Sequence, residues 1–257
     1  MPVKSKNIQE IDSAHKAGQV VRKVLDVLGR MVAPGVTTRQ LDMEAARICV
    51  ACGAECLFNG VPGSGETIPF PGNICASIDE EIVHGIPGDR MLREGEIISV
   101  DFGARLNGWC GDAARTFLVG NVDEEKARLV KVTRQSLDMA IALIQPGIGW
   151  SRIAGTMSEY IRGEGFSVVE EFVGHGIGEK MHESPKLPNF ISPALKSRDI
   201  ELYPGMILAI EPMVNMGGKE VRIQDDGWTA VTIDGKPSAH WEHTVAVTED
   251  GAKVLTA

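Results

Sequence analysis

One pattern occurs twice in this sequence, first as Gly95-Glu96-Ile97-Ile98-Ser99-Val100-Asp101 and again as Gly205-Met206-Ile207-Leu208-Ala209-Ile210-Glu211. Each copy continues from a glycine into a mainly apolar run, which predicts a buried strand, and reaches an acid six positions later. A carboxylate at the end of a buried strand is costly unless it is paired or bound to a metal. Two such carboxylates at matching positions indicate one site shared by two half-chains.

The repeat extends upstream of both strands. Pro34 and Gly53 enclose one helix-like stretch, Pro146 and Gly165 enclose another, and the separation is nineteen residues in both copies. A period of about 110 residues is much longer than the roughly 20–50 residues of solenoid repeats. We therefore expect residues 1–257 to form a single domain built from two related α/β halves, at about 8–120 and 121–257.

Composition excludes several classes of protein. The net charge of −9 argues against a non-specific nucleic-acid binder, which needs a basic face. The chain has an odd number of cysteines, five, which favours reduced thiols and a cytoplasmic location over a disulfide framework. We expect no secretory signal, because the first twelve residues lack an apolar segment, and no membrane span.

Helical periodicity and capping residues predict the helices. A long helix begins near Ile8 and ends before Pro34, and Thr37 or Thr38 caps the next one. Asp123 is the expected cap of a helix that runs to Ile144, and Ser151 the expected cap of one that ends near Gly163.

Turn residues and apolar runs predict the strands. Residues 59–72 are rich in glycine and proline and should form a loop, followed by a strand over residues 73–77. Residues 96–104 and 109–119 should form a hairpin around Asn107-Gly108. From Phe166 onward the chain should be mainly β.

The hairpin is expected to bring Asp101 and Asp112 almost opposite each other. Like charges on facing strands repel, so one carboxylate must take up a proton unless a cation lies between them. Two solvated acids on an exposed face are the simpler alternative, but the apolar flanks, such as Ile98 and Phe117, argue against it.

Three more residues complete a candidate metal cluster. His175 lies between glycines in Gly174-His175-Gly176, and Glu211 and Glu242 lie within or beside apolar strands. Four carboxylates and one imidazole suit divalent Mn, Fe, Co or Zn, and this ligand set does not choose among them. Five ligands exceed the need of one tetrahedral ion and suit a pair about 3.5–4 Å apart, an arrangement used by hydrolases.

Six motifs contain or accompany these residues: Val83-His84-Gly85-Ile86-Pro87, Ser99-Val100-Asp101-Phe102-Gly103, Gly111-Asp112-Ala113-Ala114, Gly174-His175-Gly176-Ile177-Gly178, Ile210-Glu211-Pro212-Met213 and Glu242-His243-Thr244. In these motifs, and over nearly its whole length, the chain resembles the type I methionine aminopeptidases, which have the creatinase-like "pita-bread" fold. The resemblance implies an α+β fold with two pseudo-symmetric α/β halves around a central antiparallel sheet.

The resemblance also implies roles for individual residues. The metal ligands would be Asp112, His175, Glu211 and Glu242 for one ion, and Asp101, Asp112 and Glu242 for the other. Glu211, His84 and His182 would be catalytic, and both histidines would contact substrate. The pocket for the methionine side chain would comprise Cys75, Phe70, Trp228 and Met213.

The implied activity is metal-dependent removal of the initiator methionine from nascent polypeptides whose second residue is small. We expect a monomer that associates transiently with the ribosome and has neither nucleic-acid specificity nor a membrane contact. Two alternatives remain open at the level of sequence: an X-Pro aminopeptidase or prolidase-like peptidase, and a non-catalytic binding module on the same fold.

The chain departs from the family pattern at three places. The loop 59–72 is longer than usual, Met181 replaces the aromatic residue that commonly precedes the second histidine, and Phe190 follows Asn189 where tyrosine or tryptophan is usual. None of the three is a candidate metal ligand. Met181 and Phe190 bear on the shape of the substrate pocket, and the loop 59–72 is open to three interpretations: a lid, a partner contact or an inert segment.

Overall fold

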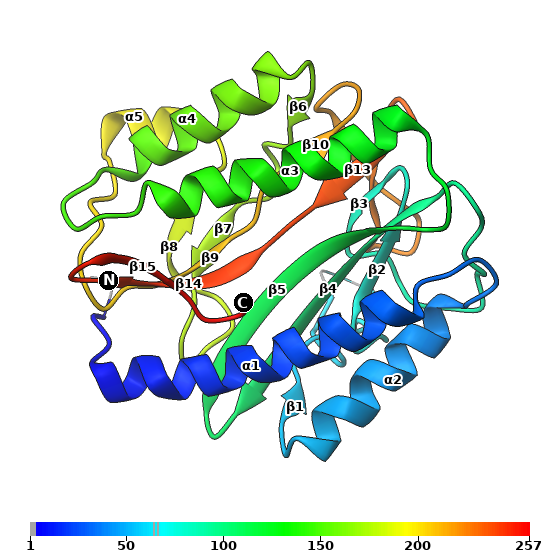
Figure 1. Ribbon diagram of the computed structural model, residues 1–257, viewed down its shortest axis with the longest axis horizontal. Coiled ribbons are helices and arrows are strands. Elements are labelled where there is room, and N and C mark those ends of the chain that lie inside the picture. Colours follow the sequence, from blue (N-terminus) through cyan, green and yellow to red (C-terminus); the bar gives the residue numbers. More distant parts are fainter. Residues whose placement is uncertain (1–3, 64, 66) are drawn as a thin grey trace.

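Five helices are defined in the computed structural model, which describes residues 4–63, 65 and 67–257 (Figure 1). They are α1 (Ile8–Met31), α2 (Thr38–Ala51), α3 (Glu124–Ala142), α4 (Trp150–Gly163) and the short α5 (Pro193–Ser197). Asn7 and Thr37 close capping boxes at the starts of α1 and α2, and Asp123 caps α3.

The strands form four antiparallel sheets. A four-stranded sheet joins β1 (Glu55–Cys56), β4 (Ile97–Leu106) and β2 (Cys75–Ile78), with β5 (Trp109–Leu118) also paired to β4. A five-stranded sheet has the order β15 (Gly251–Val254), β14 (His243–Thr248), β9 (Ile207–Ile210), β7 (Gly174–Gly176), β8 (Glu183–Leu187). The two three-stranded sheets are β13 (Ser238–His240), β10 (Met213–Asn215), β6 (Ser167–Val168), and β11 (Val221–Ile223), β12 (Ala230–Thr232), β3 (Glu81–Val83).

Corresponding glycines in the two copies of the repeated pattern have the same backbone conformation. Their positive φ angles match: 89° at Gly35 and 82° at Gly147, and 87° at Gly95 and 91° at Gly205. A residue with a Cβ rarely adopts this conformation, which is why glycine recurs there. The chain closes on itself alike in each copy, because the amide of Gly35 donates to Leu92 O at 2.8 Å and that of Gly147 to Leu202 O at 2.7 Å.

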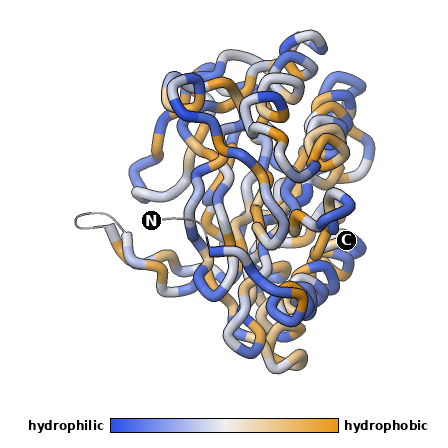
Figure 2. Tube along the Cα trace, turned by 90° about the vertical axis from the view of Figure 1, so that its left-hand side faces the viewer, coloured by the Kyte–Doolittle hydropathy of each residue, from blue (hydrophilic) through white to orange (hydrophobic). Residues whose placement is uncertain are grey.

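The long helices cover one side of the sheets. Figure 1 shows α1 and α2 over the β4–β5 hairpin and α3 and α4 over the second half, and in Figure 2 the helices gather on one side of the strands. Each helix pair buries its own apolar cluster. Val24, Leu28, Leu41, Val100 and Phe102 belong to the first cluster, and Leu129, Trp150, Met157, Leu208 and Val245 to the second.

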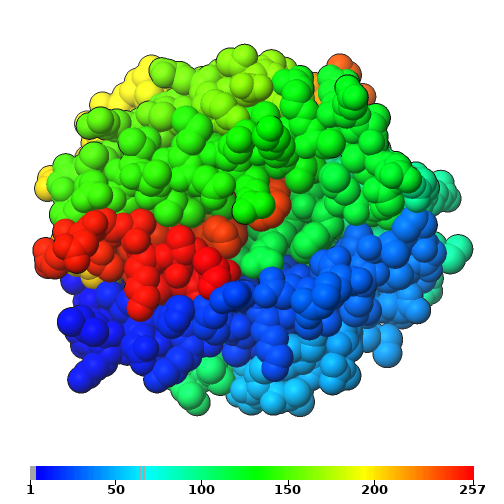
Figure 3. Space-filling view, in the orientation of Figure 1, coloured from blue at the N-terminus to red at the C-terminus, as the bar shows by residue number. Residues whose placement is uncertain are grey.

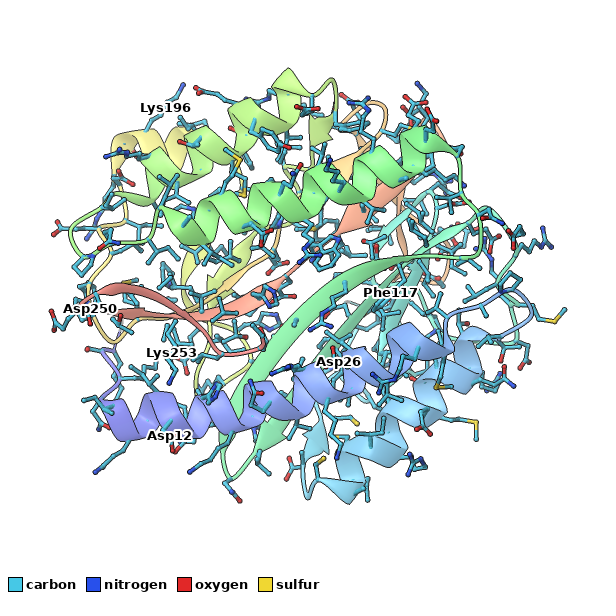
Figure 4. The ribbon with its side chains drawn as sticks, in the orientation of Figure 1. Asp12, Asp26, Phe117, Lys196, Asp250 and Lys253 are labelled. Atoms are coloured by element: carbon cyan, nitrogen blue, oxygen red, sulfur yellow. The ribbon has the colours of Figure 1, made fainter. Side chains whose placement is uncertain are left out.

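The contact between α1 and β5 is close. Gly29 lies against Phe117, since a Cβ at residue 29 would be 2.6 Å from Cε1 of that ring. On the same two elements the guanidinium of Arg115 donates to Asp26 at 2.6 Å, and Figure 4 labels both Asp26 and Phe117. The hairpin is therefore fixed from the helical side, which leaves its other face for the site.

Residues 8–120 and residues 121–257 contact each other where β5 runs beside β14. The amide of Glu242 donates to Ala114 O at 2.9 Å. The hydroxyl of Thr244 accepts from the amide of Asp112 at 3.0 Å and donates to Asp112 O at 2.7 Å. In Figure 3 the C-terminal segment also lies against α1, where the Gln19 amide donates to Leu255 O at 2.9 Å. The hydrogen bonds of Glu242 with Ala114 and of Thr244 with Asp112 hold Asp112 and Glu242 at this boundary.

Most predicted elements are confirmed within a few residues, and one predicted cap is wrong. Ser151 does not cap α4: Gly149 occupies the N-cap position and offers no side chain. The carboxylate of Asp199 accepts from the amide of Ser151 at 2.9 Å instead, so a residue from outside the helix supplies the cap. The predicted loop 59–72 contains neither helix nor strand among its described residues, and residues 64 and 66 lie outside them.

Candidate metal centre

Side chains that alternate between the two faces of β4 and β5 separate the site from the apolar core. Val100 and Phe102 of β4, and Ala113 of β5, belong to the apolar cluster under α1 and α2. Because successive side chains of a strand point to opposite faces, Asp101 and Asp112 point away from the helices. The candidate ligands from the second half come from other strands: His175 lies in β7, Glu211 directly follows β9, and Glu242 directly precedes β14.

All five candidate ligands line one cavity of about 260 Å³, together with His84, His182, Cys75, Phe70 and Trp228. Asp101 and Asp112 are diagonal neighbours on their face rather than opposite each other, because Asp101 pairs with Ala114 and Asp112 with Gly103. The other two residues of this square on the same face, Gly103 and Ala114, are both small. A Cβ at Gly103 would lie 2.6 Å from Cε of Met181, so the missing side chain makes room for the cavity wall.

His175 presents a lone pair to the carboxylates. Its Nδ1 lies 2.9 Å from the carbonyl oxygen of Gly176 and donates to it, because a carbonyl can only accept. Its Nε2 lies 3.5 Å from Oε1 of Glu211 and 3.9 Å from Oδ2 of Asp112. Burial lowers the pKa of His175 to about 4, so the ring is neutral near pH 7. A neutral imidazole with its other nitrogen anchored is the usual form of a histidine ligand.

The four carboxylates lie close together, with Asp112 and Glu242 buried and Asp101 and Glu211 half-buried. Burial, together with the charge of Asp112, raises the pKa values of Asp101, Glu211 and Glu242 well above their ordinary range. Burial also raises the pKa of Asp112, to about 7, against the opposing effect of its hydrogen bonds. Among the ion pairs of the described residues, Asp112 and Glu211 pair only with His175, and Asp101 and Glu242 have no basic partner.

The donor atoms fit a divalent metal. Oδ1 of Asp101, Oδ1 of Asp112 and Oε1 of Glu242 are buried without a hydrogen-bond partner in the described part of the chain. Ligand atoms of Asp112, His175 and Glu242 lie within 4.8 Å of one another. Buried carboxylate oxygens without donors are costly, and a cation satisfies several of them at once.

Two further histidines, His84 and His182, line the same cavity as the cluster. Burial, helped by the nearby His182, lowers the pKa of His84 to about 4, and its backbone has a positive φ of 61°. Its ring packs edge-on against Phe172, with the centroids 5.3 Å apart. His182 is solvent-exposed at the rim, and its ring packs against that of His175 at 4.4 Å.

One wall of the cavity is apolar. Phe70 and Trp228 pack edge to face with their centroids 5.2 Å apart, and the indole of Trp228 donates to Ile68 O at 2.9 Å. Cys75 lies on this side too, opposite Asp101 in the pairing of β2 with β4. Sequence reasoning missed Phe58 and Val61, which also line the cavity. Their apolar character inside a Gly- and Pro-rich stretch was the available signal.

Met213 and His240 lie in an adjoining region. Met213 is fully buried and lines a neighbouring cavity of about 510 Å³. The two cavities share His84, His182 and Glu211 in their linings. Opposite Met213 in the pairing of β10 with β13 is His240, which lines the same neighbouring cavity. The site therefore continues past the carboxylates, away from the aromatic wall.

A neutral imidazole and four carboxylates, two of them buried and two half-buried, line one cavity with an apolar wall, as expected of a metal-dependent hydrolase. The chain belongs to metallopeptidase family M24, whose family model matches residues 12–249. It is 45% identical to the methionine aminopeptidase of Clostridium perfringens over 98% of this chain and 97% of that protein. It is 43% identical to methionine aminopeptidase 1 of Bacillus subtilis over 98% of both.

Solved structures confirm the predicted pita-bread fold. The crystal structure of the methionine aminopeptidase from Thermotoga maritima matches with a TM-score of 0.93 at 39% identity and covers 99% of both chains. The prolidase from Pyrococcus horikoshii matches with a TM-score of 0.77 at 20% identity, over 98% of this chain and 63% of that one, a likeness of fold alone.

Among the described residues, no helix is long and apolar enough to cross a membrane.

Proposed function

We propose that this chain is an aminopeptidase that removes the N-terminal methionine from nascent polypeptides whose second residue is small. The observation that carries the proposal is the position of the carboxylate cluster beside the aromatic wall of Phe70 and Trp228. An unbranched thioether side chain suits such a wall, because sulfur packs favourably against ring edges. The adjoining carboxylates then lie near the first peptide bond.

The proposed ligand assignment is the one that the resemblance to the methionine aminopeptidases implies. Asp112, His175, Glu211 and Glu242 would hold one divalent ion, and Asp101, Asp112 and Glu242 a second. Such ions, when bound, polarise a carbonyl group and lower the pKa of a water molecule toward neutrality. The orphaned oxygens of Asp101, Asp112 and Glu242 support two ions over one, because three of the four carboxylates have unused acceptors.

The remaining chemistry belongs to side chains of the protein. Glu211 is the proposed general base: its carboxylate takes a proton from the attacking water and later passes it to the leaving amine. His182 donates a hydrogen bond to the oxygen of the scissile carbonyl as negative charge develops there. His84 is neutral near pH 7 and can hydrogen-bond to the backbone of the second residue of the substrate.

The test is release of free methionine from Met-Ala-Ser and Met-Lys-Ser by metal-free protein, with and without added Co or Mn. Metal-dependent cleavage of the first peptide alone is expected. A matched reaction with Ala-Pro separates the prolidase alternative, which predicts cleavage of that dipeptide. If neither peptide releases methionine although metal is shown to bind, the proposed activity is contradicted.

The Glu211→Gln variant tests the general-base role. It keeps the shape of the side chain and removes the basic oxygen, so turnover should fall by about 100-fold or more. Near-normal turnover with metal bound would refute that role.

We further propose a cytoplasmic monomer organised as one catalytic domain with two related halves, which meets its substrates transiently at the ribosome. All proposed ligands come from one chain, which supports activity without a partner subunit. Sedimentation of the purified protein at micromolar concentration tests the monomer, and co-sedimentation with ribosomes tests the association.

A further inference from the structure

A buried lysine lies behind the segment that carries His182. The side chain of Lys6 is only 3% exposed, and its Nζ donates to Oε2 of Glu183 at 2.6 Å. These partners are 177 positions apart in the sequence. Lysine is seldom buried unless its charge is paired, so this ion pair has to form for the N-terminal segment to pack here.

The backbone around Lys6 is fixed independently of its side chain. Its amide donates to Gly205 O at 2.8 Å, and the hydroxyl of Ser5 donates to Pro204 O at 2.9 Å. Gly178 provides the space for the ion pair, because a Cβ there would lie 2.9 Å from Cε of Lys6 and 2.7 Å from Oε1 of Glu183. The backbone of Lys6 is thus held by Gly205, two residues before β9, and its side chain reaches into the turn after β7.

Glu183 organises that turn with both carboxylate oxygens. Oε2 accepts from Lys6, and Oε1 accepts from the amide of Lys180 at 3.1 Å. The amide of Gly178 in turn donates to Lys180 O at 3.1 Å. His182 lies between these fixed points, and within the described residues its ring has no hydrogen bond, only the contact with His175.

We propose that Lys6 is a positioning residue for His182: through Glu183 it holds the 178–183 turn so that the His182 ring stays beside His175 and faces the substrate carbonyl. The inference rests on the proposed function for the role of His182 in the reaction. A donor that stabilises a developing charge must be in place before the reaction, so loosening the turn costs transition-state stabilisation. We expect a smaller effect on substrate binding, because most of the contact with the methionine side chain is assigned to the aromatic wall.

The kinetic test is a double-mutant cycle of Lys6→Met and His182→Ala in the metal-loaded enzyme. Lys6→Met should lower kcat by roughly 10- to 100-fold with KM changed less than about twofold, because a misplaced donor weakens only the transition state. Lys6→Arg, which keeps the charge, should recover most of kcat. In the His182→Ala background, Lys6→Met should lower kcat less than about twofold further, since coupled residues are non-additive.

The control variant is Lys126→Met, which breaks a partly buried ion pair with Asp79 at 2.9 Å, remote from the carboxylate cluster. It should lower the thermal stability and leave kcat unchanged. A loss of kcat in this variant that equals that of Lys6→Met would overturn the inference, because the effect would then follow stability alone.

The second readout is amide hydrogen exchange in the metal-free protein. Lys6→Met should speed exchange at Lys180, whose amide donates to Glu183, and leave the amides of α3 unchanged. If His182→Ala retains full kcat, the proposed role of His182 is wrong, while exchange still decides whether Lys6 holds the turn. If His182→Ala lowers kcat but Lys6→Met does not, or acts equally in both backgrounds, the positioning role is wrong. Should Lys6→Met fail to fold, Lys6→Gln replaces it in the cycle.

Discussion

Binding of a divalent metal should stabilise the folded protein and release protons. In the metal-free protein the pKa values of Asp101, Glu211 and Glu242 are raised well above their ordinary range by burial and mutual repulsion, and that of Asp112 is about 7. Metal ligands must be deprotonated, so protons that these carboxylates hold at pH 6.5 leave when metal binds. His175 contributes none, because its pKa of about 4 already makes it neutral.

The stabilisation can be estimated from linkage. Free metal at 100 times its dissociation constant adds about 2.7 kcal/mol to the free energy of unfolding. A domain of this size gains about 2–4 °C in Tm per kcal/mol, so Mn or Co should raise Tm by about 5–11 °C. A carboxylate whose folded pKa is raised favours the folded state only while protonated. The metal-free protein should therefore lose stability as pH rises from about 4 to 7.

The assay combines thermal unfolding with titration calorimetry in two buffers of different ionisation enthalpy. The dependence of the measured heat on the buffer gives the number of protons released, which should be larger at pH 6.5 than at pH 8.5. Asp112→Asn should abolish most of the metal-dependent shift in Tm, whereas the remote control Asp199→Asn should retain it. A metal-independent Tm, or binding without proton release at pH 6.5, would refute the reasoning.

Three substitutions test how the site is supported. Gly103→Ala should raise KM for methionyl peptides severalfold with little change in Tm, because the new methyl group displaces Met181 from the cavity wall; an unchanged KM would contradict this. Thr244→Val removes both hydrogen bonds to the backbone of Asp112 and should lower the free energy of unfolding by about 1–3 kcal/mol, as measured with denaturant. A smaller decrease would indicate that water replaces the hydroxyl. Asp199→Ala removes the cap of α4 and should cost about 1 kcal/mol at pH 7. Burial raises the pKa of Asp199, but hydrogen bonds from Ser151 and Ile200 outweigh it, so the pKa is lowered. The cost of Asp199→Ala should therefore shrink as pH falls below about 4. A cost that does not change with pH would contradict the assignment.

Local signals in the sequence were sufficient for most elements of the fold. The helices begin at side-chain caps such as Asn7 and Asp123, and they follow an apolar periodicity that depends only on neighbouring residues. The prediction of a cap at Ser151 was wrong, since the donors at the start of α4 are satisfied by Asp199, 48 positions away. A capping carboxylate that arrives from another segment leaves no local pattern.

The candidate site was predictable in its residues and less so in its geometry. Asp101 and Glu211 stand at equivalent ends of the repeated strands, so the sequence alone indicated that carboxylates from both halves share a site. Phe58 was missed, because its place on the cavity wall depends on how the loop after β1 packs over Gly103.

The sequence by itself determined the repeated glycine-to-acid strands, the hairpin and the donor set, because each depends on residue type and spacing along the chain. Only the tertiary structure decided that Asp101 and Asp112 are diagonal neighbours, that Thr244 clamps the backbone of Asp112, and that Lys6 pairs with Glu183 behind His182. These contacts join segments far apart in the chain, so their geometry follows from how the two halves pack and not from any local preference.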